Sequence, residues 1–162
     1  MLTGALSVLE KDINSTCVDL LCFDVGNERF AVELPFVDEV VDAAVLDAHT
    51  TNGSMVGVLR LRDELLPVHD AERVLHAKRQ SAEPIALVFT SRGAPMAMLV
   101  DNAEAALAVD MDALRSPSAV VARDSVLLGA LKVGNRWVGL LDAESLIDAF
   151  GRVALAEELH AH

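Results

Sequence analysis

The side chains best suited to chemistry in this sequence are five histidines and two cysteines. Cys17 and Cys22 stand five residues apart on one expected strand, so they face opposite sides of it and suit neither a disulfide nor a shared metal. Two small buried thiols are the preferred interpretation. No pair of histidines has HExxH or comparable ligand spacing; they are His49, His69, His76, His160 and His162. We therefore predict no metal site.

The sequence also lacks the motifs that activate nucleophiles or bind phosphates. It contains no GxSxG, no cysteine beside a suitable base, no GxGxxG, and no GxxxxGK followed by Ser or Thr. Carboxylates are plentiful, but pairs such as Asp38–Glu39 and Glu157–Glu158 are adjacent in sequence, as on a solvated face, rather than convergent. We predict no catalytic residue and no cofactor, and hence a protein that is not an enzyme.

The composition favours a soluble cytoplasmic protein with an aliphatic core. Hydrophobic residues make up 52% of the 162 residues, but aromatic residues only 4%. The net charge of −12 repels phosphate backbones and anionic lipid headgroups, which argues against nucleic acid and against direct membrane contact. No apolar run reaches the roughly 18 residues of a membrane span. Residues 1–7 carry no Lys or Arg, unlike a secretory signal.

The elements that must carry any function form two copies of one pattern. A shift of 72 residues places Gly57–Leu61 on Gly129–Val133 and Asp70–Glu72 on Asp142–Glu144. A shift of 66 residues places the earlier strands of the two copies on each other. The change from 66 to 72 implies a six-residue insertion in the second copy, within the loop 110–124.

Each copy predicts five strands joined by tight turns, followed by a short helix. The expected strands are 18–25, 29–34, 37–42, 56–61 and 64–69 in one copy, and 85–91, 95–100, 103–109, 127–133 and 136–141 in the other. Pro67 interrupts one of these strands and predicts that it is an edge strand. The helices are expected over 71–77 and 143–150, capped by Asp70 and Asp142.

This pattern predicts a mainly β protein of two tandem five-stranded barrels with short connecting and C-terminal helices. The expected divisions are an amphipathic N-terminal helix (1–16), a first barrel (17–83), a second barrel with a helix (84–150) and a helical or frayed acidic tail (151–162).

Arg62 is the residue that the fold explains least. The turn Leu61–Glu64 corresponds to Val133–Arg136, where Gly134 stands in place of Arg62, so the backbone does not demand an arginine. An arginine at an exposed turn of an acidic protein is a suitable anchor for a partner's carboxylate. A solvated pair with Asp63 or Glu64 is about equally supported by the sequence.

Several of these segments resemble the CheW-like domain of bacterial chemosensory systems. The resemblance is carried by Phe30–Val32, Val37–Val40, Val56–Val68, Met98–Asp101 and Gly129–Leu131. It implies two SH3-like barrels. It also implies a cytoplasmic adaptor, recruited to membrane receptor arrays, that joins a chemoreceptor's helical tip to the regulatory domain of a CheA-type histidine kinase. The positions that match the family's receptor groove are Val37, Glu39, Gly57, Arg62 and Ala103.

The sequence departs from the family at this groove. The usual Asn-Leu-Arg-Gly reads Arg60–Asp63, and Ala103 replaces a usual valine, which removes on the order of 1–2 kcal/mol of apolar contact if buried in an interface. These departures motivate an alternative, a scaffold module of a non-flagellar pathway that binds kinase or other CheW-like domains without a receptor. A small-molecule binder that uses the cleft between the barrels is a third hypothesis.

Overall fold

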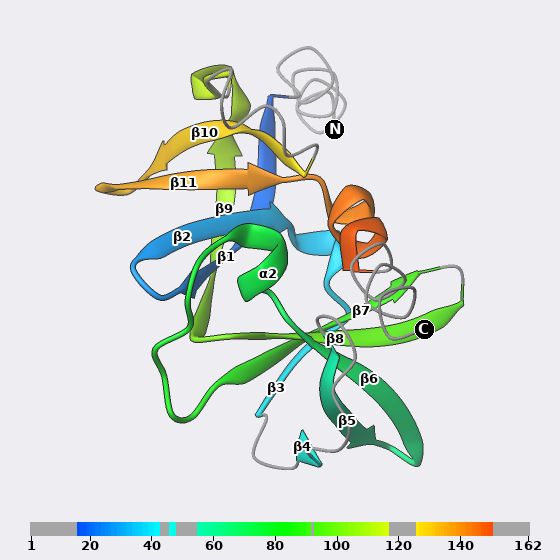
Figure 1. Cartoon of the computed structure of the whole chain (residues 1–162). Helices are drawn as coiled ribbons and strands as arrows, with labels where there is room; N and C mark the ends of the chain where they lie inside the picture. Colours follow the sequence, from blue (N-terminus) through cyan, green and yellow to red (C-terminus); the bar gives the residue numbers. More distant parts are fainter. Residues whose placement is uncertain (1–15, 43–45, 48–54, 92, 117–125, 151–162) are drawn as a thin grey trace, which may run out of the picture.

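The computed structural model describes residues 16–42, 46–47, 55–91, 93–116 and 126–150, and its strands form two sheets (Figure 1). Sheet A has the order β10 (Leu127–Val133), β11 (Arg136–Leu141), β2 (Glu28–Glu33), β1 (Cys17–Val25) and β9 (Asn102–Asp110). Sheet B has the order β3 (Glu39–Asp42), β7 (Ile85–Ser91), β8 (Ala94–Val100), β6 (Glu64–Asp70), β5 (Met55–Leu61) and β4 (Leu46–Asp47). The predicted mainly β fold, with a small barrel-like unit around each sheet, is confirmed.

Each sheet combines strands from both halves of the sequence, whereas the repeat predicts one barrel from 17–83 and another from 84–150. Sheet A contains β1 and β2 from the first half and β9, β10 and β11 from the second. Sheet B contains β3, β4, β5 and β6 from the first half and β7 and β8 from the second. The exchange occurs at two corners, the 3₁₀ turn η1 (Leu34–Phe36) and Asp101. Neither corner has the positive φ of a tight hairpin turn, so the chain bends into the other sheet instead of reversing within its own.

Sheet A closes on itself after β9. The chain passes through the 3₁₀ turn η3 (Met111–Ala113), and Arg115 then pairs with Ala130 of β10 through two backbone hydrogen bonds of 2.7 and 2.9 Å. In sheet B the two edge strands, β3 and β4, are neighbours in the sequence. Each unit therefore encloses its own buried side chains.

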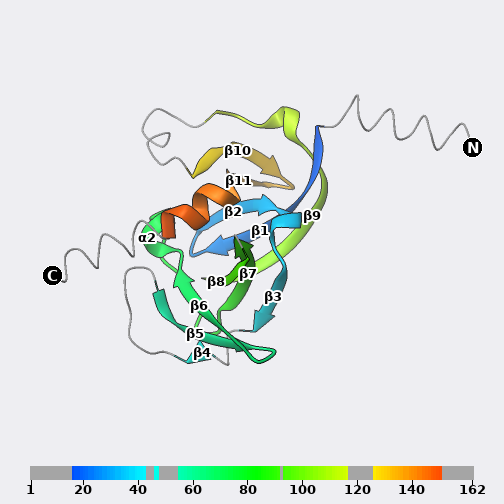
Figure 2. The same cartoon turned by 90° about the vertical axis from the view of Figure 1, so that its right-hand side faces the viewer.

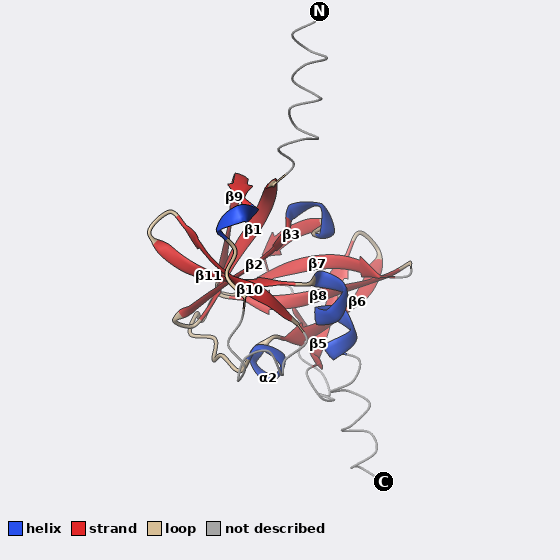
Figure 3. Ribbon diagram, turned by 90° about the horizontal axis from the view of Figure 1, so that it is seen from above, coloured by secondary structure: helices blue, strands red, loops and turns tan. Residues whose placement is uncertain are grey.

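The buried side chains form three clusters, because successive residues of a strand face opposite sides. Leu20 and Cys22 of β1 point into the unit of sheet A, while Leu21 and Phe23 point into a larger cluster between the two sheets, which we call the central core. Figure 3 shows the two sheets side by side around this region. The central core holds four of the chain's five phenylalanines, Phe23, Phe30, Phe89 and Phe150. The aliphatic core predicted from composition therefore describes the two barrel interiors, and aromatic rings join the units.

A short helix follows β6, as predicted, but it is shorter than 71–77. The helix α2 spans Glu72–Leu75 and ends at His76, whose left-handed backbone (φ 55°) cannot continue it. The Asp70 carboxylate accepts the N–H of Glu72 at 3.1 Å, which satisfies one of the free donors at the helix start.

The second predicted helix is present over 143–150 and packs into the central core. Phe150, the last residue of this helix that the structure describes, stacks on His69 with ring centroids 5.0 Å apart. Burial lowers the pKa of His69, which favours the neutral imidazole beside the ring.

The linker between the two halves is fastened to sheet A by Asp101. Its carboxylate accepts backbone N–H groups from Gly26 at 2.6 Å, from Ser81 at 2.8 Å and from Gln80 at 3.1 Å. Gly26 has φ +64°, and a Cβ there would lie 2.2 Å from the carbonyl oxygen of Lys78. Only glycine therefore allows the linker to cross this turn.

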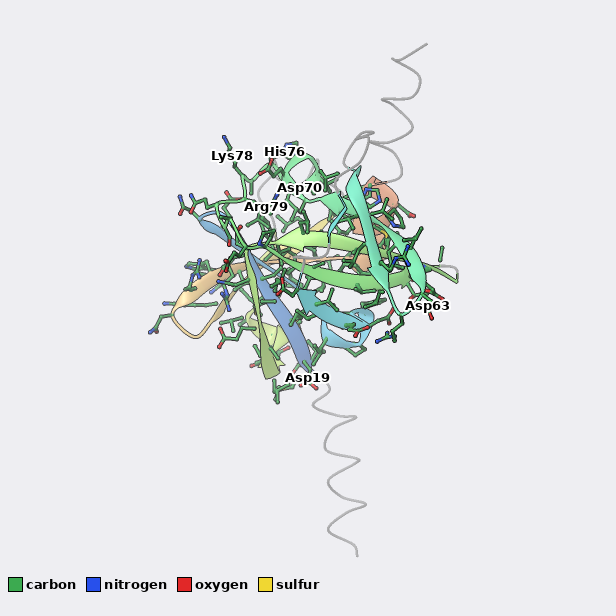
Figure 4. All side chains as sticks on the ribbon, turned by 90° about the horizontal axis from the view of Figure 1, so that it is seen from below. Asp19, Asp63, Asp70, His76, Lys78 and Arg79 are labelled. Atoms are coloured by element: carbon green, nitrogen blue, oxygen red, sulfur yellow. The ribbon has the colours of Figure 1, made fainter. Side chains whose placement is uncertain are left out.

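A second contact holds the same linker to sheet B. The Arg79 guanidinium binds Asp70 through Nε at 3.0 Å and Nη2 at 2.9 Å, and the Arg79 N–H donates to Glu72. In Figure 4, Asp70, His76, Lys78 and Arg79 gather on one side of the molecule. The linker thus ties the end of β6 to the β1–β2 turn.

Two smaller predictions differ from the structure. Pro67 lies on β6, which pairs with β5 and β8 and is no edge strand. Proline has no backbone N–H to donate, but β6 pairs with β8 only from Val68 onward. At Pro67 the strand is therefore paired with β5 alone. Cys22 is buried, but Cys17 is exposed at the start of β1. Of the predicted N-terminal helix (1–16), residues 1–15 lie outside the described residues, as do the predicted tail (151–162), which carries His160 and His162, and the loop residue His49.

Candidate partner-binding surface

Two of the predicted binding residues, Arg62 and Glu39, are in direct contact. The guanidinium donates from Nη1 to Oε1 at 3.0 Å and from Nη2 to Oε2 at 2.7 Å. Arg62 lies in the β5–β6 turn and Glu39 on β3, which is not a neighbour of either strand in sheet B. Figure 2 shows the β5–β6 turn and β3 at the same corner of the molecule. The sequence offers Asp63 or Glu64 as the partner of Arg62, and the structure supplies Glu39.

The backbone of this turn is strained. Arg62 has φ 47° and Asp63 has φ 70°, both in the left-handed region that disfavours residues with a Cβ. The corresponding turn between β10 and β11 places Gly134 at φ 62°, where no such penalty applies. The turn geometry therefore favours glycine at Arg62, and the arginine must be explained by its side chain.

The ion pair positions the guanidinium more than it stabilises the fold. The Arg62 side chain is 73% exposed and that of Glu39 is 31% exposed, so water screens their attraction. The hydrogen bond from Arg62 lowers the pKa of Glu39, which keeps the carboxylate charged. A two-bond contact fixes the plane of the guanidinium while its outer edge remains open to a partner.

Val37 and Ala103 lie at the border of the central core, half-buried and packed against it. Val37 directly follows η1, and Ala103 stands opposite Phe23 in the β1–β9 pairing. Gly57 is buried on β5 opposite Val68, at the far end of the strand that leads to Arg62. The structure thus joins Glu39 to Arg62 and places Val37 and Ala103 between the sheets, while Gly57 belongs to the interior of β5.

Three exposed hydrophobic residues lie close to Glu39 or Arg62 in the sequence and were not predicted. Phe36 precedes Val37, Val40 follows Glu39, and Leu65 lies three residues after Arg62. Leu65 is 63% exposed, and Leu107 and Leu128, on strands of sheet A, are also at least half exposed. The signal available in the sequence is the pair Val40–Val41, because alternation allows only one of two neighbouring valines to face the interior.

No group of three His, Cys, Asp or Glu side chains in the described part of the chain is placed to hold a metal ion. No helix in the described ranges is long and apolar enough to cross a membrane.

The similarities to known proteins extend over most of the chain. A family model described as the CheW-like domain matches residues 19–150. The crystal structure of the scaffolding protein TtCheW from Thermoanaerobacter tengcongensis is similar, with a TM-score of 0.69 and 19% sequence identity over 80% of this chain and 87% of that chain. At this identity the similarity concerns the fold. No curated protein sequence matches the chain.

Proposed function

Because the chain belongs to the CheW-like domain family, we propose that it is a non-catalytic chemosensory adaptor. It couples the cytoplasmic tip of a chemoreceptor to the regulatory domain of a CheA-type histidine kinase. In this role it works in the cytoplasm and is recruited to membrane receptor arrays by its partners.

The observation that carries this proposal is the exposed guanidinium of Arg62 on a turn that favours glycine. Glu39 holds the guanidinium with its outer edge open to solvent. Buried apolar contacts surrounding a charged anchor are the usual composition of a protein interface. Phe36, Val40 and Leu65, which are close to Glu39 or Arg62 in the sequence, add exposed apolar area, and Val37 and Ala103 border the central core.

The test is calorimetric titration of the full chain with a helical hairpin from a chemoreceptor tip. We expect micromolar binding that Arg62→Ala weakens about tenfold, in the range of an interface anchor. Val37→Asp places a charge at the border of the central core and weakens binding at least as much. Unchanged affinity in both variants contradicts the groove assignment.

The matched control is Lys132→Ala, which removes another exposed cation from β10 of sheet A. It leaves receptor affinity unchanged if the site is local to Arg62. An equal loss in Lys132→Ala and Arg62→Ala indicates general charge attraction in place of a docking site.

The pairing of Arg62 with Glu39 also favours a second candidate, because the two terminal guanidinium nitrogens, Nη1 and Nη2, already bond within the chain. In this alternative the protein is a scaffold of a non-flagellar pathway that binds kinase or other CheW-like domains without a receptor. Kinase regulatory domain then binds the chain in the absence of receptor, and Arg62→Ala does not change that affinity. Receptor-dependent kinase recruitment excludes this alternative.

A further inference from the structure

A groove on the opposite side of the molecule from Arg62 has the features of a small-molecule site. It has a volume of about 700 Å³ and lies between α2 and strands β2, β10 and β11. This volume is within the range of roughly 300–1,000 Å³ that is typical of small-ligand pockets. Figure 4 shows His76, which lines the groove, far from Asp63 at the β5–β6 turn.

The floor of the groove is apolar and is shaped by a glycine. Phe30 and Leu141, both members of the central core, line it together with Leu127. A Cβ on Gly139 would lie 3.1 Å from Leu127 Cδ1 and 3.3 Å from Phe30 Cδ1. The absence of a side chain at Gly139 therefore lets these two residues approach the strand.

Trp137 forms one wall of the groove and is the only tryptophan in the chain. It is 59% exposed, although aromatic side chains are usually buried or covered by a partner. An exposed indole beside an apolar floor is suited to stack on a flat apolar ligand.

The charge of the groove points to an anion. Its lining contains Arg29 and Arg136 against the single carboxylate of Glu28, in a chain whose net charge is −12. Arg29 is 12% exposed and donates to Asp24 and to Glu104. Arg136 is 51% exposed, and its contact with Asp24 is one atom pair at 3.3 Å. Because a guanidinium has five N–H donors, Arg136 keeps donors that can reach a ligand at the rim.

We propose that this groove binds a small organic anion with a flat apolar body, which stacks on Trp137 and pairs its carboxylate with Arg136. This site is independent of the proposed adaptor function, because it shares no residue with the surface around Arg62.

The test uses 2-naphthoate and its neutral counterpart 2-naphthamide as ligands of the full chain. Fluorescence of Trp137 reports on the groove, and calorimetry measures affinity. We expect saturable quenching by 2-naphthoate and about fivefold weaker binding of 2-naphthamide, the modest gain of a partly exposed charged hydrogen bond. Arg136→Gln makes the two affinities equal, whereas Lys132→Gln, the matched control outside the groove, keeps their ratio.

Gly139→Val tests the floor, because the added side chain occupies the space beside Phe30 and lowers the affinity for both ligands about tenfold. Trp137→Ala, followed by calorimetry, gives the same loss without changing the floor and keeps the test valid if Gly139→Val does not fold. The proposal is overturned by quenching that does not saturate, or by equal effects of Arg136→Gln and Lys132→Gln. Arg62→Ala leaves naphthoate binding unchanged.

Discussion

The β5–β6 and β10–β11 hairpins hold corresponding places in the two halves of the sequence, yet they present different chemistry. Both have the same register at the turn, Leu61 opposite Glu64 and Val133 opposite Arg136. The first turn holds two left-handed residues with side chains, and the second needs only Gly134 at positive φ.

The exposed residues show what the duplication preserved and what it changed. Leu65 and Trp137 are equivalent under the 72-residue shift, and both are more than half exposed. In the first hairpin Arg62 lies three residues before Leu65. In the second, Arg136 lies directly before Trp137. The interior of each hairpin is thus kept by packing, while the turns and exposed positions are free to serve different ligands.

The largest loss of stability is expected from substitutions in the interior of the hairpins, where the two copies should behave alike. Leu59 and Leu131 are equivalent positions, 1% and 0% exposed. Leu59→Ala and Leu131→Ala each lower the free energy of unfolding by about 3 kcal/mol, because each removes buried methyl groups and leaves a cavity. Urea denaturation measures both. A loss below about 1 kcal/mol in either variant means that the two interiors are not equivalently packed.

The next effect comes from a residue that breaks the symmetry between the copies, Asp101. Its counterpart at the first corner is Pro35, which has no carboxylate. Asp101→Ala lowers the free energy of unfolding by about 2 kcal/mol, because three N–H groups lose their acceptor and water only partly replaces it. Chemical denaturation provides the measurement, and Pro35→Ala is the control at the equivalent corner. Equal losses in both variants contradict the role of Asp101 as the fastening of the linker.

The contribution of Asp101 also depends on pH. Partial burial alone raises the pKa of this carboxyl, but the N–H groups of Gly26, Ser81 and Gln80, together with the charge of Arg79, lower it by more, so the net pKa lies below its ordinary value of 3.8. A carboxyl whose pKa is depressed by folding stabilises the fold above its unfolded pKa and loses that effect as the pH falls through its folded pKa. The stability difference between the native chain and Asp101→Asn therefore stays constant near neutral pH and shrinks below 3.8. Denaturation curves at a series of pH values test this, and a difference that grows on acidification contradicts it.

The smallest effects separate the two turns themselves. Gly134→Ala destabilises by about 1 kcal/mol through its backbone alone, because nothing lies within 4 Å of the added Cβ. Asp63→Gly stabilises by about 0.5 kcal/mol, since glycine accepts the left-handed conformation more readily. Thermal unfolding resolves the two opposite signs. Destabilisation by Asp63→Gly indicates that its carboxylate makes a contact worth more than the strain.

Local features of this fold were predictable from sequence, and long-range ones were not. The strand ranges, the glycine turns and the helices after Asp70 and Asp142 follow from periodicity and capping, which involve only near neighbours. The strand exchange depends on how Pro35 and Asp101 turn the chain, and two similar copies offer equivalent partners for each strand. Pairing patterns alone therefore do not decide which strands share a sheet.

The same distinction applies to the candidate surfaces. The comparison of the copies identified Arg62, because glycine replaces it in one of them. It did not identify Glu39 as the residue whose carboxylate binds Arg62, because the curvature of sheet B is what brings Glu39 to the turn. The same comparison gives no reason to select Arg136, which matches a turn residue of the first copy, or Trp137, which matches a strand residue. Only the placement of α2 against them creates a groove.

The exchange of strands also sets the order in which this protein becomes foldable during translation. The β1–β2 hairpin is made early, but β1 pairs with β9 and β2 pairs with β11, which are made much later. Until then Leu21 and Phe23 have no central core to enter and remain exposed on the nascent chain, so we expect the folding of sheet A to wait for the second half. A gene split between the two halves should therefore yield no folded fragment from either piece, and a folded product only when both are expressed together.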